Sequence, residues 1–237
     1  MTMGQLVLSR LPRRARSAQA KAERARDLEN AALAALAHTP WRDLAVAHVA
    51  RDAGVAKGTL YLYFPTKESL GVALVGRLLG AWFDDVVAAL DARTAPITPA
   101  ACAELLVGAT ARHRALVPLL AITGTLLETN VSPATARRFK AELLKRTLEG
   151  GAAVERAIPS LASGSGTRFL LHVHALVTGL YRMAEPAPVV KAVLSTPRFA
   201  ALRVDFAAEL TFALTALLTG LVASRRASST RRQPEFP

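Results

Sequence analysis

The chain has 237 residues, 51% of them hydrophobic, which is enough to bury a substantial core. Aromatic residues make up only 5%, while Ala and Leu are abundant, so the composition favours helices and predicts an all-α protein. Thirty Lys and Arg against 18 Asp and Glu give a formal charge of +12, which indicates a polyanionic partner, either nucleic acid or an anionic membrane surface. The single cysteine, Cys102, excludes an intrachain disulfide and fits a reducing cytoplasm.

The N-terminal segment is strongly basic. Residues 1–20 contain Pro12 and show little periodicity, so we expect a disordered basic arm. Apolar residues at helical spacing then predict a helix over 21–37, which ends before Pro40. No signal peptide is predicted, because the apolar stretch 6–8 is too short. Charges interrupt the most apolar helical segments, so no transmembrane span is predicted either.

Two short predicted helices follow. The first covers 44–53, and Gly54 lies where a helix end needs a left-handed residue. The second covers 57–64 and ends at Pro65. Two short helices joined by a tight turn containing Gly are typical of a helix-turn-helix. Thr66 then predicts the N-cap of a long helix that runs to about residue 92.

The segment 49–70 reads VARDAGVAKGTLYLYFPTKESL. It resembles the DNA-binding signature of the TetR family, which has an apolar-Ala pair, Ala-Gly-Val, Gly-Thr-Leu-Tyr, an aromatic-Phe pair and Lys-Glu-x-Leu. The resemblance implies an all-α protein with a helix-turn-helix DNA-binding domain over 21–70. It also implies a helical effector-binding and dimerisation domain over 71–223. Residues 224–237 are rich in Arg, Ser, Thr and Pro, so we expect a disordered tail.

The first turn of the second short helix suits entry into a DNA major groove. Lys57 brings charge, Gly58 allows close backbone approach, and Thr59 offers a hydroxyl and a methyl group. Leu60 and Phe64, four residues apart, are expected to face the core together. By the resemblance, the DNA-binding positions are Val46, Lys57, Gly58, Thr59, Tyr61, Leu62, Tyr63 and Lys67, with Tyr61 divided between packing and a phosphate contact.

One position departs from the family pattern. The family commonly has Thr at the start of the first helix of the motif, where it caps the helix and contacts phosphate. Here Ala45 takes its place, which loses a cap worth ~1 kcal/mol. Asp43 is a substitute cap two residues earlier, although its carboxylate would repel phosphate.

The C-terminal half is predicted to contain further helices at about 98–113, 115–129, 132–157, 167–184 and 199–223. Thr98-Pro99 and Ser132-Pro133 are helix start signals. The resemblance implies a pocket among the middle helices, for which the large or polar candidates are Trp82, Phe83, His113, Thr123, Leu127, Phe139, Phe169 and His172. Apolar stripes on the last two long helices favour a dimer interface with Leu176, Leu180, Phe206, Leu210, Leu214 and Leu217. The alternative is that both stripes are ordinary core of one protomer.

Other functional classes have weaker support in the sequence. Catalytic motifs such as HExxH, GxSxG or a Gly-rich phosphate loop do not occur, so no enzyme and no cofactor are predicted. A metal sensor would need His113, His172 and His174 to converge. A peripheral membrane protein would need apolar anchors beside the basic segments. The favoured hypothesis is a cytoplasmic, homodimeric repressor that binds a palindromic operator and is released by an apolar small-molecule effector.

Overall fold

The computed structural model describes residues 13–230, with side chains for residues 19–225. Within these ranges the secondary structure is entirely helical, which confirms the predicted all-α class. The chain forms two compact units that divide between Leu74 and Val75. The division lies inside a single helix, α5 (Lys67–Asp91), four residues after the boundary suggested by the sequence.

The first unit is built from short helices. It contains α2 (Arg13–Leu36), the 3-10 turn η1 (Trp41–Asp43), α3 (Val46–Asp52), α4 (Lys57–Tyr63) and the start of α5. Helix α2 begins eight residues earlier than predicted, so residues 13–20 are helical and not a disordered arm. Arg, Ala and Gln make up seven of its eight residues, and all three are strong helix formers. The rest of the predicted arm, residues 1–12, lies outside the described residues.

The core of the first unit comes mainly from its four α-helices, α2, α3, α4 and the start of α5. Its most buried side chains, none more than 1% exposed, include Leu28, Ala32, Val49, Ala50, Leu60 and Leu70. Gly54 separates α3 from α4 with a φ of +68°, the left-handed conformation predicted for this position. The α5 helix begins at the predicted cap, because Thr66 Oγ1 accepts a hydrogen bond from the Ser69 amide at 3.0 Å. Ser69 Oγ accepts from the Thr66 amide in return, at 3.1 Å.

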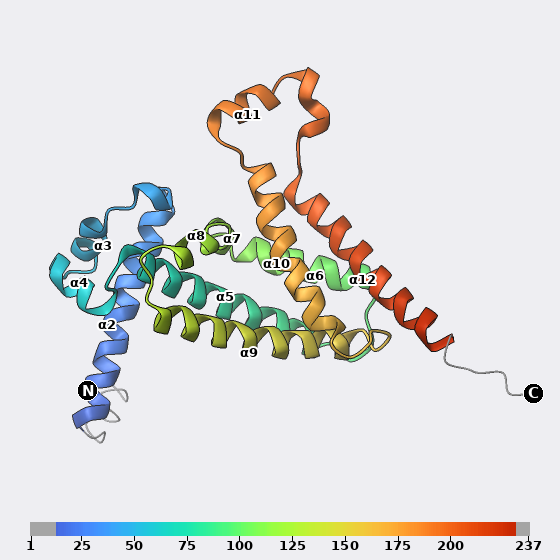
Figure 1. The fold of residues 1–237 in the computed structure, drawn as a ribbon, viewed down its shortest axis with the longest axis horizontal. Helices are drawn as coiled ribbons and strands as arrows, with labels where there is room; N and C mark the ends of the chain where they lie inside the picture. The colour runs from blue at the N-terminus through green and yellow to red at the C-terminus, as the bar shows by residue number, and fades with distance from the viewer. Residues whose placement is uncertain (1–12, 231–237) are drawn as a thin grey trace, which may run out of the picture. The chain divides into compact units, whose positions relative to one another are not determined.

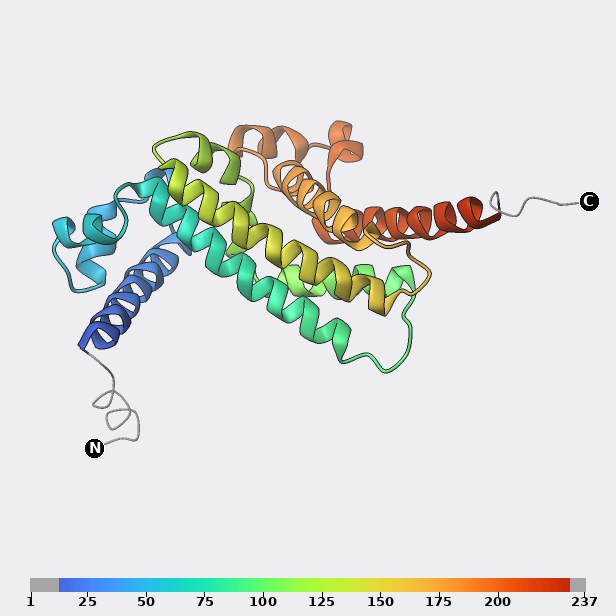
Figure 2. The same cartoon turned by 60° about the horizontal axis from the view of Figure 1, so that its bottom comes forward.

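The second unit holds the remaining helices. After α5 come α6 (Pro99–Arg112), α7 (Leu116–Leu120), α8 (Thr123–Glu128), α9 (Pro133–Ala157), α10 (Ser165–Ala184), α11 (Pro188–Leu194), the 3-10 helix η2 (Pro197–Leu202) and α12 (Phe206–Thr230). Helix α10 crosses and packs against α9, and α12 packs against both α6 and α10 (Figure 1). Figure 2 shows α5 and α9 running side by side. Thr98 and Ser132 cap α6 and α9, as predicted.

Two glycines set the distance between α9 and α10. A Cβ added to Gly166 would lie 2.0 Å from the carbonyl oxygen of Gly151. A Cβ added to Gly151 would lie 2.5 Å from the backbone nitrogen of Thr167. The two helix backbones therefore touch directly at this crossing, and no larger residue fits either position without a backbone shift.

Two helix predictions in this unit are wrong in detail. The segment 115–129 is two short helices, α7 and α8, which are separated near Ile122, where the backbone is not helical. The final helix starts at Phe206 and not at 199, because Pro197 supports only the short η2 before an extended residue, Arg203.

The end of α12 lies beyond the predicted domain end at 223. Helix α12 continues to Thr230, so residues 224–230 are helical and not a disordered tail, whereas 231–237 lie outside the described residues. The guanidinium of Arg225 donates hydrogen bonds to the carbonyls of Pro159 and Leu161, at 2.6 and 2.5 Å. This contact fixes the loop between α9 and α10 to the end of α12.

Helix α12 leaves much apolar surface uncovered. Among the described residues, the stretch Pro197–Arg225, which comprises η2 and most of α12, is long and apolar enough to span a bilayer by length and composition alone. Within it, residues 210–224 contain no Asp, Glu, Lys or Arg. Only 17% of its most apolar window is buried within the chain. One face of this helix therefore needs a further partner.

Candidate nucleic-acid interface and ligand cavity

Helix α4 separates its buried side chains cleanly from its exposed ones. Leu60 is fully buried and Phe64, just after the helix, is 7% exposed, so both lie in the core as predicted. Leu62 is 77% exposed and Tyr61 is 40% exposed, although both are large hydrophobic residues. These two neighbouring side chains form the exposed surface of the helix beyond its first turn.

The N-terminal turn of α4 is narrow and cationic. Lys57 and Gly58 are exposed and Thr59 is half-buried. A Cβ added to Gly58 would meet nothing within 4 Å, so the outer side of this turn is open to a partner. The Lys57 ammonium lies 6.0 Å from the centre of the Tyr61 ring, which keeps the charge beside the exposed aromatic side chain. Tyr63 is half-buried at the end of the helix.

Lys67 also makes contacts within the first unit, with residues of η1. Its ammonium donates a hydrogen bond to the carbonyl of Arg42 at 3.1 Å and lies 5.1 Å from the centre of the Trp41 ring. Partial burial lowers the pKa of Lys67, while Glu68 and Asp43 oppose that shift. Lys67 thus ties η1 to the start of α5, in addition to any contact with DNA.

Two expectations in helix α3 are wrong. Val46 is only 8% exposed, so its side chain packs in the core of the first unit and is not the exposed side chain expected at this position. Asp43 does not cap the helix, because its carboxylate pairs with Arg42 at 3.3 Å and no side chain caps α3. The N-cap residue itself, Ala45, is exposed.

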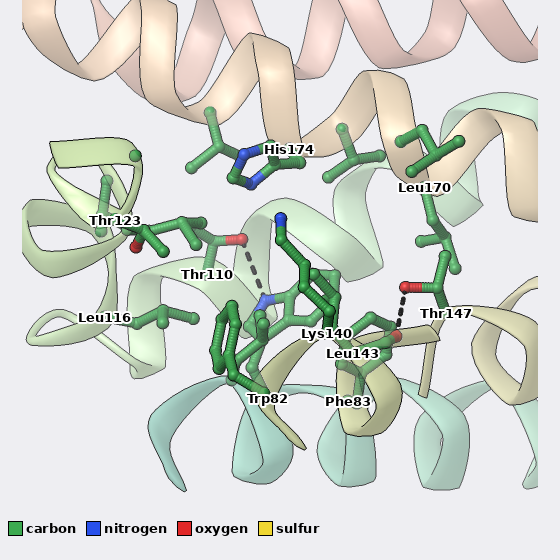
Figure 3. Close-up of a pocket in the computed structure, with 18 of the residues that line it drawn as sticks. Trp82, Phe83, Thr110, Leu116, Thr123, Lys140, Leu143, Thr147, Leu170 and His174 are labelled. Atoms are coloured by element: carbon green, nitrogen blue, oxygen red, sulfur yellow. Dashed lines mark hydrogen bonds between the residues drawn. The ribbon is translucent and has the colours of Figure 1, made fainter. Parts of the chain in front are cut away.

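The second unit contains a cavity of about 270 Å³ between α5, α6, α7, α8, α9 and α10. Its walls are mainly leucine, valine and aromatic side chains (Figure 3). Five of the eight predicted pocket residues line it: Trp82, Phe83, Thr123, Leu127 and Phe139. The structure therefore brings together positions that are 57 residues apart in the chain.

The other three predicted pocket residues lie outside the lining. Phe169 is fully buried in the core. His172 is exposed on the surface of α10. His113 bonds to Asp85 at 2.9 Å, and this bond is the main reason why the pKa of the Asp85 carboxyl is lowered.

The hydroxyl groups in the cavity wall are already engaged. Thr110 accepts a hydrogen bond from the Trp82 indole at 3.2 Å and donates to the Leu106 carbonyl at 2.8 Å. Thr123 donates to the Leu119 carbonyl, and Thr147 donates to its own helix in the same way. The inner wall thus offers no free hydroxyl proton to a ligand.

Two ionisable side chains that the sequence analysis did not place in the pocket complete the lining. Lys140 on α9 points toward His174 on α10 across the cavity mouth (Figure 3). Burial, and to a lesser extent the charge of Lys140, lower the pKa of His174. Lys140 lies in a polar stretch of α9 and His174 in an apolar stretch of α10, 34 residues later, so their convergence cannot be seen in the sequence.

The predicted interface residues divide into two groups. Leu210 and Leu214 are fully buried within the chain, so they serve the core of the second unit and are not available to a partner. The other four, Leu176, Leu180, Phe206 and Leu217, are half-buried. An exposed face that the sequence analysis missed carries Ala175, Gly179 and Met183 on α10, and Phe212, Ala216 and Gly220 on α12.

Two further kinds of site, a metal site and a reactive cysteine, find no support in the described residues. Among the described residues, no group of three His, Cys, Asp or Glu side chains is placed to hold a metal ion. Burial raises the pKa of the Cys102 thiol to about 12, which fits the expected role of a small buried hydrophobic residue.

Two family descriptions match the chain. Residues 29–74 match "Bacterial regulatory proteins, tetR family", which covers the helix-turn-helix. Residues 77–225 match "Tetracyclin repressor-like, C-terminal domain", which covers most of the second unit. A search of curated proteins gives no match.

Solved structures share the fold. A transcriptional regulator from Rhodococcus sp. RHA1 is 18% identical, with a TM-score of 0.52 over 84% of this chain and 96% of that one. A transcriptional regulator from Cytophaga hutchinsonii is 19% identical, with a TM-score of 0.50 over 83% and 95%. At such identities the likeness shows the fold alone.

Proposed function

The chain belongs to the TetR family of DNA-binding transcriptional regulators, which are not enzymes, and we propose that it is a repressor. In this proposal a homodimer binds a palindromic operator in the cytoplasm, and a small molecule in the cavity of the second unit releases it. Residues 21–70 bind DNA and residues 71–223 bind the effector and the second protomer. The observation that carries the proposal is helix α4, which buries Leu60 and exposes Lys57, Gly58 and Leu62.

The proposed DNA contacts lie on and beside this helix. Its open first turn would enter the major groove, with Lys57, Gly58 and Thr59 closest to the bases. Tyr61, Leu62, Tyr63 and Lys67 would contact the backbone and the groove edges. Val46 is left out of this set because its side chain is buried.

Dimerisation is proposed through the exposed face of α10 and α12. Phe212 is 71% exposed and Met183 is 56% exposed. Gly179 and Gly220 have nothing within 4 Å of an added Cβ, so small residues would let helices of two protomers approach closely. A second copy would cover the apolar surface of α12, and its two-fold axis would match a palindromic operator.

The effector would act by differential binding. A molecule that fits the cavity better in the conformation that does not match the operator lowers operator affinity by that difference in binding free energy. The cavity lies between six helices, so a change in its occupancy can shift how those helices pack.

The test is selection of operator fragments from genomic DNA of the source organism. Purified protein is incubated with fragmented DNA at moderate salt, and the retained fragments are sequenced. We expect a short palindrome from the wild type. Lys57→Glu should lose that palindrome, and its affinity for it should fall about tenfold or more, because the cation placed closest to the bases becomes an anion beside a polyanionic duplex.

The matched control is Lys145→Glu, the same charge reversal at an exposed lysine on α9. It should retain the palindrome. Recovery of the same unrelated fragments by wild type and Lys57→Glu would mean that the basic charge binds DNA without sequence preference, and would overturn the proposal.

A further inference from the structure

The cavity of the second unit has an uneven distribution of polar groups. Its inner wall is apolar, and the threonine hydroxyls there donate to backbone carbonyls of their own helices. What remains of their hydrogen-bonding capacity is acceptor lone pairs. An anionic head group would gain no donor at this depth, so only the apolar part of a ligand suits the inner wall.

The mouth of the cavity has the opposite character. Lys140 and His174 are its ionisable lining residues, and no Asp or Glu lines it. Among the described residues, no carboxylate lies within 4.0 Å of the Lys140 ammonium. Its neighbour across the mouth, His174, is held toward the neutral form by burial and by the lysine charge. The mouth thus presents one cation and one imidazole that can donate a hydrogen bond.

We propose that the cavity binds a small amphipathic carboxylate, with its apolar body among the leucine and aromatic side chains and its carboxylate held by Lys140 and His174 (Figure 3). The assignment rests on the proposed function, because this molecule would be the effector. A carboxylate gains charge-assisted hydrogen bonds from the ammonium and a further one from the ring. A neutral alcohol of the same length keeps only the apolar contacts, and an amine is repelled.

The size of the cavity limits the ligand. About 270 Å³ corresponds to roughly nine water volumes, which suits a medium-length alkyl chain or a small ring system. The ten-carbon series decanoate, 1-decanol and decylamine therefore separates the effect of the head group from that of the chain.

Trp82 provides a direct reading of occupancy. It lines the cavity, and the chain has only one other tryptophan, Trp41, in the first unit. A Trp41→Phe background leaves Trp82 as the single tryptophan reporter. In this background we expect decanoate to change the fluorescence saturably, with a Kd at least tenfold lower than that of 1-decanol. Decylamine should not bind measurably. Equal affinity for decanoate, 1-decanol and decylamine, or binding of none of the three, would overturn the proposal.

Two variants test the roles of individual side chains. Lys140→Met keeps the apolar stem and removes the charge, so decanoate affinity should fall about tenfold or more while 1-decanol affinity stays the same. His174→Phe should cause a smaller fall in the same direction. Lys145→Met is the control, because that lysine lies on α9 outside the lining. Circular dichroism and thermal unfolding check that each variant folds. Unchanged decanoate affinity in a folded Lys140→Met protein would refute the assignment.

Operator binding separates this inference from the function on which it rests. Decanoate that binds the cavity but leaves operator affinity unchanged would refute its role as effector while supporting the chemistry of the site. A wild-type protein that selects no operator but still discriminates decanoate from 1-decanol would overturn the proposed function alone.

Discussion

The two units place their large side chains in opposite ways. In the first unit, the seven-residue helix α4 buries Leu60 and turns Leu62 and Tyr61 outward, so the candidate interface is the outer surface of one short element. In the second unit, the candidate sites are a cavity and an exposed face shared between long helices. The contrast teaches that the first site depends on side-chain identity, whereas the second depends on the spacing between helices.

The sharpest test of this contrast uses two faces of α12. Leu214→Ala should lower the free energy of unfolding by about 2–5 kcal/mol, because it leaves a cavity in the core of the second unit. Phe212→Arg should leave protomer stability within about 0.5 kcal/mol, since that side chain is 71% exposed. It should instead raise the dimer dissociation constant about a hundredfold.

Urea unfolding and sedimentation velocity measure the two quantities separately. Phe212→Arg protein that remains dimeric would place the interface elsewhere and break the proposed role of the exposed face.

The next effect concerns the crossing of α9 and α10. Gly166→Ala should destabilise the second unit by about 3 kcal/mol, because its methyl group collides with the Gly151 carbonyl and the backbones must separate. The melting temperature should fall by about 6–12 °C. Gly108→Ala on α6 is the matched control, since its Cβ would meet its nearest neighbour at an ordinary 3.7 Å. It should be neutral or stabilising, and equal losses in both variants would contradict the close packing.

These features also show what the sequence can predict. The helix-turn-helix follows from local signals, and its Thr66 cap, its Gly54 turn and its buried Leu60 and Phe64 are confirmed. The cap and the turn depend on neighbours within a few residues, and the two core positions were predicted from their spacing of four residues. Val46 is the exception, because its burial depends on how α3 packs against α2 and α4.

The second unit was less predictable because its sites are assembled over long distances. His113 looked like a pocket residue, but its partner, Asp85, lies 28 residues away. Lys140 looked like a surface residue, and only the fold brings it toward His174. The stripe on α12 marked apolar residues without showing which of its two faces is covered inside the protomer.

A smaller effect is expected at the start of α3. Ala45→Thr should supply the missing cap and stabilise the first unit by about 1 kcal/mol. It should also tighten operator binding if the hydroxyl reaches a phosphate. Trp41 fluorescence in a Trp82→Phe background reports unfolding of this unit. Ala47→Thr, at an exposed position inside the same helix, should instead be slightly destabilising; stabilisation by both would argue against a capping effect.

The smallest expected effect is at Cys102. With a thiol pKa of about 12, only about one thiol in ten thousand is ionised at pH 8. Iodoacetamide should therefore not modify the native protein measurably, but should modify it in urea.

Comparing the urea dependence of Cys102 alkylation with that of Trp41 fluorescence follows the two units independently. We expect the first unit to unfold at lower urea, and coincident transitions would show that they unfold as one.

The bond between Arg225 and the loop carbonyls of Pro159 and Leu161 bears on where this protein can be cut or fused. A chain shortened to residue 223, where the apolar pattern stops, would lose this arginine and leave both carbonyls to water. A chain ended after residue 230 would retain it. Affinity tags and reporter fusions therefore belong beyond α12. A charged residue such as Arg225, which lies past the apolar pattern, can still hold a loop of the folded unit in place.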